Sequence, residues 1–339
     1  MPTFRSGEVT EIISERRGLQ RVRVADQRAY VLTQLTGPVA VGDRVVMNTT
    51  AVELGLGTGG WHVVHWNLSR DEWSEPGPGH IMKLRYTSLQ VDAGAGEEQH
   101  PDLPTDLAGT PVVACSLHSQ VPGVAATVKH LRPDARVSYV MTDGAALPLA
   151  FSDLVVAMGE AGILDGTVTA GHAFGGDLEA VTVASALTLA RHVQHADVIV
   201  VAMGPGVVGT GTALGTTALE VAAILDSTDA LGGAAVACVR VSDGDARERH
   251  RGISHHTLTA LSHRRGRATV ALPAGVEPPA AAPGLTIEQL GRDDVPDVPA
   301  LLAALGLRVT TMGRGPAEEP RFFAACGAAG VVATLLLTT

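Results

Sequence analysis

The chain has 339 residues, of which 45% are hydrophobic, and this is enough apolar material for two packed domains. Its formal net charge is -10, with 25 Lys and Arg against 35 Asp and Glu, which is unfavourable for binding a polyanion. We therefore expect an ordered protein with no nucleic-acid partner and no membrane partner.

Residues 1 to about 75 have the pattern of a small β-barrel-like domain. The chain begins without the apolar run of a secretory signal peptide, so we expect a cytoplasmic protein. Short alternating runs separated by a turn at Gly37 and Pro38 are typical of a compact set of β-strands. The expected strands are 20–24, 28–35, 41–47 and 61–66.

A connecting segment is predicted from 76 to 110, where two polar stretches flank a run, 81–91, with room for one or two strands. From 111 to 339, short β-rich runs alternate with longer amphipathic runs, which is the pattern of βαβ units. Near-continuous apolar strands such as 198–202 are typical of a parallel sheet buried on both faces. This part is therefore predicted to be a doubly wound α/β domain with a mainly parallel sheet and three layers.

The elements of this domain are expected in the following places. Strands are predicted at 112–116, 136–141, 166–170, 197–202, 234–241, 268–272, 285–289 and 307–311. Helices are predicted at 121–131, 153–161, 178–193, 217–226, 257–262, 298–305 and at the end of the chain.

Two further features concern packing. The free cysteines Cys115, Cys238 and Cys326 form no C-x-x-C pair and lie in apolar runs, so we expect them to be buried. The apolar run 322–337 is too short for a membrane span and favours a helix buried in the core or in a subunit interface. Together with the apolar end 331–339, it leads us to expect a homo-oligomer, namely a dimer.

Polar residues collect after the predicted strands of the α/β domain. Ligands of open parallel sheets bind outside the carboxyl ends of the strands, and five consecutive strands end in polar residues. We therefore expect one shared polar pocket, with Ser116 and Thr142 as candidate ligand-binding residues. The candidates for acid–base catalysis are His118, Asp143, His172, Asp177, His255 and His256.

The same edge could hold a divalent metal ion, although no spacing is diagnostic. Adjacent His255 and His256 on a helix point about 100 degrees apart, so only one of them is expected to join a common centre. Each histidine has a structural alternative as a hydrogen-bonded core residue, and Asp177 has one as the cap of a helix beginning at Leu178. The candidate metal ligands are His118, Asp143, His172 and Asp177.

A glycine-rich segment, Gly204 to Gly215, follows the fourth strand of the domain. Its first letters match the dinucleotide fingerprint, but Pro205 removes an amide and the acidic Asp243 lies too far along the chain. An anion site is the better prediction, because glycines admit a ligand close to the backbone and threonines add donors; a turn that only allows tight packing is the alternative. The candidate ligand-binding residues here are Gly204, Gly206, Gly209, Thr210, Gly211 and Thr212.

Several strings of the sequence carry a resemblance. They are 48–50, 55–60, 116–120, 139–144, 171–180, 201–212 and 249–260. In these strings the chain resembles an uncharacterised bacterial protein family known only as a domain of unknown function, and the similarity runs through nearly the whole chain. The resemblance implies no activity and no catalytic role for any residue.

The functional expectation is an enzyme acting on a small anionic metabolite, such as a phosphorylated one, held by the Gly204 to Gly215 loop. A hydrolase or transferase is favoured over an NAD-dependent oxidoreductase, and no cofactor is predicted apart from the candidate metal ion. The alternative is a non-catalytic sensor or scaffold, in which the same pocket binds a metabolite and the N-terminal barrel contacts a partner.

Overall fold

The computed structural model describes residues 1–57 and 59–337, which form two compact units, Met1–Gly94 and Ala95–Thr339. The boundary falls inside the segment 76–110 that was predicted to connect two domains. Among the described residues, no helix is both long enough and apolar enough to cross a lipid bilayer. Residues 338–339, at the end of the predicted oligomer contact, lie outside the described residues.

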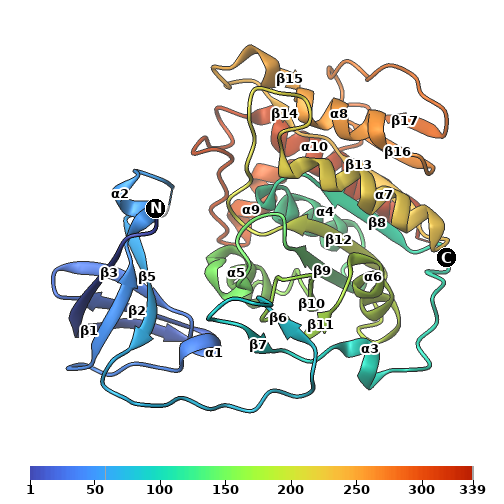
Figure 1. Cartoon of the computed structure of the whole chain (residues 1–339). Coiled ribbons are helices and arrows are strands. Elements are labelled where there is room, and N and C mark those ends of the chain that lie inside the picture. The colour runs from blue at the N-terminus through green and yellow to red at the C-terminus, as the bar shows by residue number, and fades with distance from the viewer. Residues whose placement is uncertain (58, 338–339) are drawn as a thin grey trace. The chain divides into compact units, whose positions relative to one another are not determined.

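The first unit is a closed β-barrel, as predicted (Figure 1). The longest strand pairs with the strands on either side and is bent by register shifts near Val9 and Ile12, which lets it close the barrel. Inward residues such as Val22, Val45 and Val64 are buried and form the core. In barrel order the strands are β1 (Phe4–Arg16), β2 (Leu19–Val24), β3 (Gln27–Val31), β5 (Trp61–Asn67) and β4 (Arg44–Asn48).

Short elements complete this unit. They are helices α1 (Thr33–Thr36) and α2 (Thr50–Glu53) and the paired strands β6 (Met82–Lys83) and β7 (Val91–Asp92). The pair β6–β7 falls at the edges of the run 81–91, where one or two strands were expected.

The second unit contains an 8-stranded sheet in which every neighbouring pair is parallel. The sheet is buried on both faces, and all six residues of the central strand Val198–Met203 are buried. In sheet order the strands are β11 (Leu178–Ala180), β10 (Gly166–Ala170), β9 (Val137–Thr142), β12 (Val198–Met203), β8 (Pro111–Cys115), β13 (Ala234–Cys238), β16 (Ala268–Leu272) and β17 (Leu285–Gln289).

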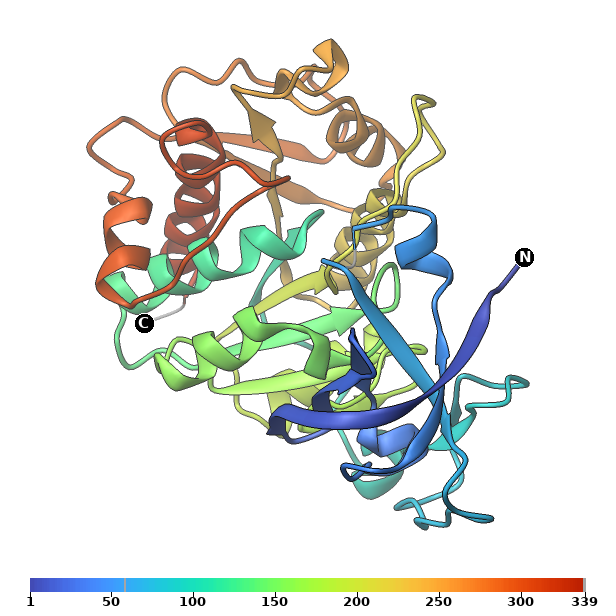
Figure 2. The same cartoon turned by 90° about the vertical axis from the view of Figure 1, so that its left-hand side faces the viewer.

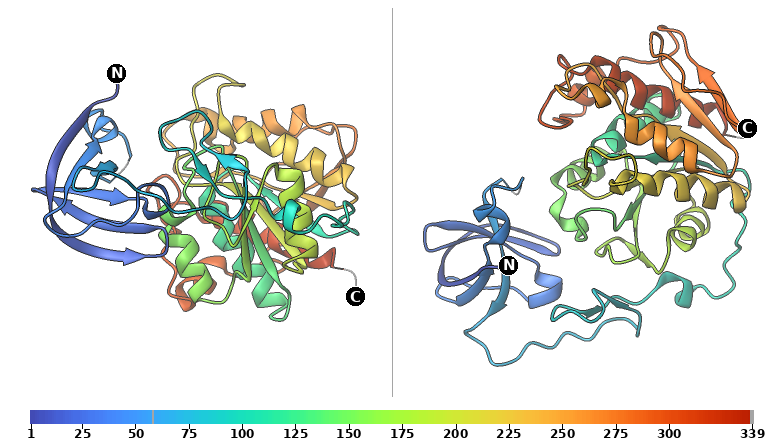
Figure 3. Two further views of the ribbon diagram at one scale, coloured as in Figure 1. Left: turned by 60° about the horizontal axis from the view of Figure 1, so that its bottom comes forward. Right: turned by 45° about the horizontal axis from the view of Figure 1, so that its top comes forward.

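Helices cover both faces of this sheet (Figures 1 and 2). Side chains of β8 alternate between two cores, Val113 and Cys115 in one and Val112 and Ala114 in the other. The first core is closed by α4 (Val121–Leu131), α5 (Asp153–Glu160), α9 (Val298–Ala304) and α10 (Pro320–Leu335). The second is closed by α6 (Val183–His192), α7 (Glu220–Ala230) and α8 (His255–His263), of which α7 and α8 contact each other (Figure 3). The predicted doubly wound α/β fold is thereby confirmed.

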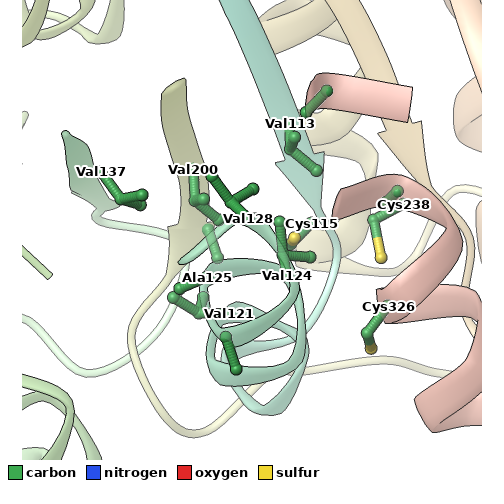
Figure 4. Packing of buried hydrophobic residues seen from close by; sticks show 14 of the residues in the cluster. Val113, Cys115, Val121, Val124, Ala125, Val128, Val137, Val200, Cys238 and Cys326 are labelled. Atoms are coloured by element: carbon green, nitrogen blue, oxygen red, sulfur yellow. The ribbon is translucent and has the colours of Figure 1, made fainter. Parts of the chain in front are cut away.

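The apolar C-terminal run is helix α10, which packs against α4 and the sheet. Its buried positions are mostly small residues, which let the helices approach closely. Cys326 on α10, Cys115 and Cys238 are buried and free, as predicted, and lie near one another in the first core (Figure 4). Burial raises the pKa of the Cys115 and Cys326 thiols, so both stay protonated.

Two predicted elements of the α/β domain are wrong, and a third begins later than predicted. The expected helix 178–193 is the edge strand β11 followed by α6, because the Thr182 side chain accepts from the Ser185 amide and begins the helix there. No strand forms at 307–311, where only an isolated bridge joins Thr311 to Arg314. The predicted helix start at Thr217 is a short 3-10 turn, Thr217–Leu219, that leads into α7.

The connections create a topological switch point in the middle of the sheet. Strands β12 and β8 are neighbours, yet β8 continues into α4 on one face and β12 into α7 on the other. Ligands of doubly wound sheets bind in the crevice outside the carboxyl ends of such strands. We therefore expect a functional site among the residues that follow β8, β9 and β12.

Candidate functional site

Two acidic side chains lie at the switch point. The Thr142 hydroxyl, at the end of β9, is 2.8 Å from each carboxylate oxygen of Glu220, the first residue of α7. Asp143 follows Thr142 and accepts a hydrogen bond of 2.9 Å from the backbone amide of His172. The structure thus brings together Thr142, Asp143 and the backbone of His172, three of the predicted site residues, and adds Glu220.

Gly171, which follows β10, is needed for this arrangement. Its φ is +65°, and a Cβ atom on it would overlap with Oδ2 of Asp143. Any other residue would be strained and would displace the carboxylate. The backbone after β10 therefore approaches the Asp143 side chain as closely as glycine allows.

Glu220 has a perturbed acidity. Burial raises its pKa to about 7; the negative charge of Asp143 acts in the same direction, whereas the hydrogen bond from Thr142 opposes it. A carboxyl with this pKa exchanges its proton near neutral pH, as a general acid or base must. No sequence pattern indicates this role, because an acidic residue at the start of a helix ordinarily interacts only with the helix dipole.

His118 is held in a closed hydrogen-bond network. Its Nδ1 lies 3.0 Å from the Tyr139 hydroxyl and its Nε2 2.7 Å from the Ser152 hydroxyl. The Tyr139 hydroxyl donates to the carbonyl oxygen of Ala202, so His118 must donate from Nδ1 and accept at Nε2. Burial lowers the pKa of His118 to about 4, so the ring is neutral. Both nitrogens are occupied, which fits the structural alternative better than a metal ligand.

Two other predicted residues also have structural partners. Oδ2 of Asp177 accepts from the amide and the hydroxyl of Thr167, at the beginning of β10, at 2.9 and 2.8 Å. Asp177 therefore does not cap α6 and lies away from the carboxyl ends of the strands. Ser116 is buried, and its amide donates to the Gln120 side chain.

A second polar cluster lies beyond β13. The strands β14 (Val241–Ser242) and β15 (Gly252–Ile253) pair and return the chain to the start of α8. There one ring nitrogen of each of His250, His255 and His256 lies within 4.8 Å of the other two. The expectation that only one of the adjacent histidines could join a common centre is wrong, because the rings of His255 and His256 tilt together, with centroids 3.9 Å apart.

A charged frame surrounds this cluster. The buried carboxylate of Asp245 lies 3.2 Å from Arg240, 2.8 Å from Arg247 and 3.5 Å from Arg314. The hydrogen bond from Arg247 holds the pKa of Asp245 well below its usual range. Three guanidinium groups thus share this carboxylate, and that of Arg314 is also paired with the buried Glu319.

The glycine-rich segment is an exposed hairpin (Figure 2, yellow). The amide of Thr210 donates to the Gly215 carbonyl oxygen at 2.7 Å, and the amide of Thr212 donates to the Thr210 hydroxyl at 3.2 Å. The hydroxyls of Thr210 and Thr212, which were predicted to bind the anion, lie 2.8 Å apart and hydrogen-bond with each other. Gly209 lies against the histidine cluster, since a Cβ atom on it would be 2.7 Å from Cε1 of His256.

Two hollows of the second unit lie away from these clusters. One of about 270 Å³ is lined by residues that include Pro273, Arg292 and Arg321, and one of about 520 Å³ by residues that include His100 and His195. Neither is lined by a residue predicted as catalytic or ligand-binding.

Comparison with known proteins gives a family but no activity. The family model described as a protein of unknown function, DUF3866, matches residues 28–330. No curated protein matches the chain. The resemblance to a domain of unknown function is thereby confirmed, and the chain belongs to the DUF3866 family.

Proposed function

We propose that the second unit is an enzyme acting on a small anionic metabolite at the carboxyl ends of its sheet strands. Glu220 carries the proposal, because this largely buried carboxyl lies at the switch point and has a pKa near 7. A group is most effective in proton transfer when its pKa is close to the working pH. We assign proton transfer to Glu220, with Asp143 beside it as the charge that helps to raise its pKa.

The anionic group of the metabolite belongs on the other side of the glycine-rich hairpin. Asp143 and Glu220 repel an anion, whereas the turn 247–251 contributes Arg247, Arg249 and Arg251. The hairpin connects the two sides, since it begins at the end of β12 and leads into the turn Thr217–Leu219, which contacts α8. The reacting atoms would then lie toward Glu220 and the anionic group toward the arginines.

A hydrolase or transferase fits this arrangement better than an NAD-dependent oxidoreductase. In a dinucleotide site the glycine-rich turn opens directly into a helix whose amides hold the pyrophosphate. Here a hairpin and a 3-10 turn separate Gly204 from α7, and the helix begins with the acidic Glu220. A pyrophosphate would face this carboxyl.

The test is turnover of a metabolite panel by the full-length chain. Phosphorylated and carboxylated metabolites are incubated with the protein, and products are detected by mass spectrometry. For any substrate found, Glu220→Gln should lower the rate by about 100-fold or more while leaving binding largely intact. The matched control is Glu277→Gln, which changes an exposed carboxyl and should leave the rate unchanged.

The same experiment separates the enzyme from the sensor. A metabolite that raises the melting temperature but is never converted would favour a non-catalytic sensor, and full activity of Glu220→Gln would remove Glu220 from the mechanism. The homodimer and the cytoplasmic location stay predictions from the sequence.

A further inference from the structure

Three histidines beside the glycine-rich hairpin have ring nitrogens that lie close to one another. His250 comes from the turn Glu248–His250, and His255 and His256 from the first turn of α8. One nitrogen of each lies within 4.8 Å of the other two. Across residues 1–57 and 59–337 this is the one such group of three His, Cys, Asp or Glu side chains.

Two of these rings have a free nitrogen. Nε2 of His255 and Nε2 of His256 are buried and have no hydrogen-bond partner, and His256 as a whole is only 5% exposed. Buried polar side-chain atoms in folded proteins are nearly always paired. Two such nitrogens in one cluster indicate a ligand that interacts with both.

Two of the rings are held by their surroundings. Nδ1 of His250 lies 2.8 Å from the Ser254 hydroxyl. Gly209 of the hairpin lies against the His256 ring, since a Cβ atom on it would be 2.7 Å from Cε1 and 3.3 Å from Nδ1 of His256. Metal-binding histidines characteristically use one nitrogen for the metal and the other for an oriented hydrogen bond.

The charges around the cluster are compatible with a cation. Metal ions bind the neutral form of imidazole, which is the main form of an ordinary histidine at pH 7. Arg240 and Arg247 face the rings, but both are paired with the buried carboxylate of Asp245. Arg249, the remaining cation that acts on the cluster, is exposed to solvent.

We propose that His250, His255 and His256 bind one divalent transition-metal ion, preferably Zn²⁺, through one ring nitrogen each. Imidazole is a preferred zinc ligand, and three histidines with a fourth position open to water or substrate make a common catalytic zinc site. Tetrahedral zinc places its nitrogens about 3.4 Å apart. Since the ring nitrogens lie within 4.8 Å of one another, each pair must close in by at most about 1.4 Å to bind one ion. The site shares no ligand with Glu220 and does not rest on its proposed role.

Metal titration of the full-length chain tests this. The protein is stripped with a chelator, and Zn²⁺ is titrated against a chromogenic competitor, with Co²⁺ absorption reporting the coordination geometry. We expect one Zn²⁺ per chain and tetrahedral Co²⁺ bands. His255→Ala and His256→Ala should each weaken binding by at least about 100-fold, since each removes a ligand. The exposed His130→Ala is the matched control and should bind like the unchanged protein.

Nitrogen NMR of the unchanged protein covers the case in which a variant fails to fold. Zinc should shift the Nε2 resonances of His255 and His256 and leave that of His130 in place. Less than stoichiometric zinc at micromolar protein, or zinc binding that survives both alanine variants in folded protein, would overturn the proposal. A cluster that responds to inorganic phosphate but not to zinc would also overturn it and assign the site to an anion.

Discussion

The two polar clusters of the second unit differ in how their side chains are satisfied. Around β9 and β12, both nitrogens of His118 have partners and the Glu220 carboxylate accepts from Thr142. Beyond β13, His255 and His256 each keep a buried nitrogen without a partner. Satisfied groups stabilise the fold or move protons, whereas converging unsatisfied groups point to a ligand. The comparison therefore separates a candidate acid–base centre from a candidate metal centre.

The largest expected effect comes from removing the buried carboxylate that Arg240, Arg247 and Arg314 share. Asp245→Ala leaves Arg240, Arg247 and Arg314 without their shared partner, and breaking a buried ion pair from one side costs about 3–5 kcal/mol. Urea unfolding measures this loss. The control is Asp134→Ala, whose exposed side chain lies 3.8 Å from Arg132 and should cost less than about 1 kcal/mol. A small loss for Asp245→Ala would mean that solvent satisfies Arg240 and Arg247 and that Glu319 suffices for Arg314.

The second effect concerns pH and the acid–base centre. The pKa of Glu220 is raised from 4.5 in the unfolded chain to about 7 in the fold, so the folded protein binds the proton more tightly. Stability from this group is complete below pH 4.5 and is lost as the pH rises through 7, by up to about 3 kcal/mol.

In Glu220→Gln this pH-dependent loss of stability should vanish. The difference in the free energy of unfolding between the two proteins should therefore shift in favour of the variant as the pH rises through 7. Urea unfolding from pH 4 to pH 8 measures the difference, with Glu277→Gln as the exposed control. A parallel pH profile for Glu220→Gln and the unchanged protein would show that Glu220 titrates normally and would weaken its assignment to proton transfer.

The sheet could be predicted because its signals are local. The apolar run 268–272 is strand β16 with the expected bounds, and the amphipathic run 121–131 is α4. Elements at the edge of the sheet were harder to predict. Strand β11 has only three residues, and the apolar pattern continues past Thr182, so the beginning of α6 at this capping residue does not stand out. The long strand β1 was missed because most of its residues are exposed, so it has little apolar alternation.

The candidate site was only partly predictable, because it depends on contacts between distant segments. Strand ends indicated Thr142 and Asp143, but Glu220 reaches them from the far end of a hairpin. His250 was not predicted as a site residue. It lies near His255 and His256 because the short strands β14 and β15 pair, and strands of two residues are too short to show a hydrophobic periodicity. The sequence does contain one indication of this contact: Ser254, which directly precedes His255, lies four residues after His250, and its hydroxyl is the partner of the His250 ring.

The smallest expected effect tests whether the glycine-rich hairpin positions the His256 ring for metal binding. A methyl group at Gly209 would lie 2.7 Å from Cε1 of His256 and must turn the ring, whereas one at Gly211 meets nothing within 4 Å. Gly209→Ala should therefore weaken zinc binding by about tenfold, the effect typical of disturbing a residue that orients a ligand. Gly211→Ala should leave the zinc affinity unchanged and should unfold within about 0.5 kcal/mol of the parent in the absence of metal. Equal zinc affinities for the two variants would show that the hairpin only covers the cluster, and would confine the metal proposal to the three histidines themselves.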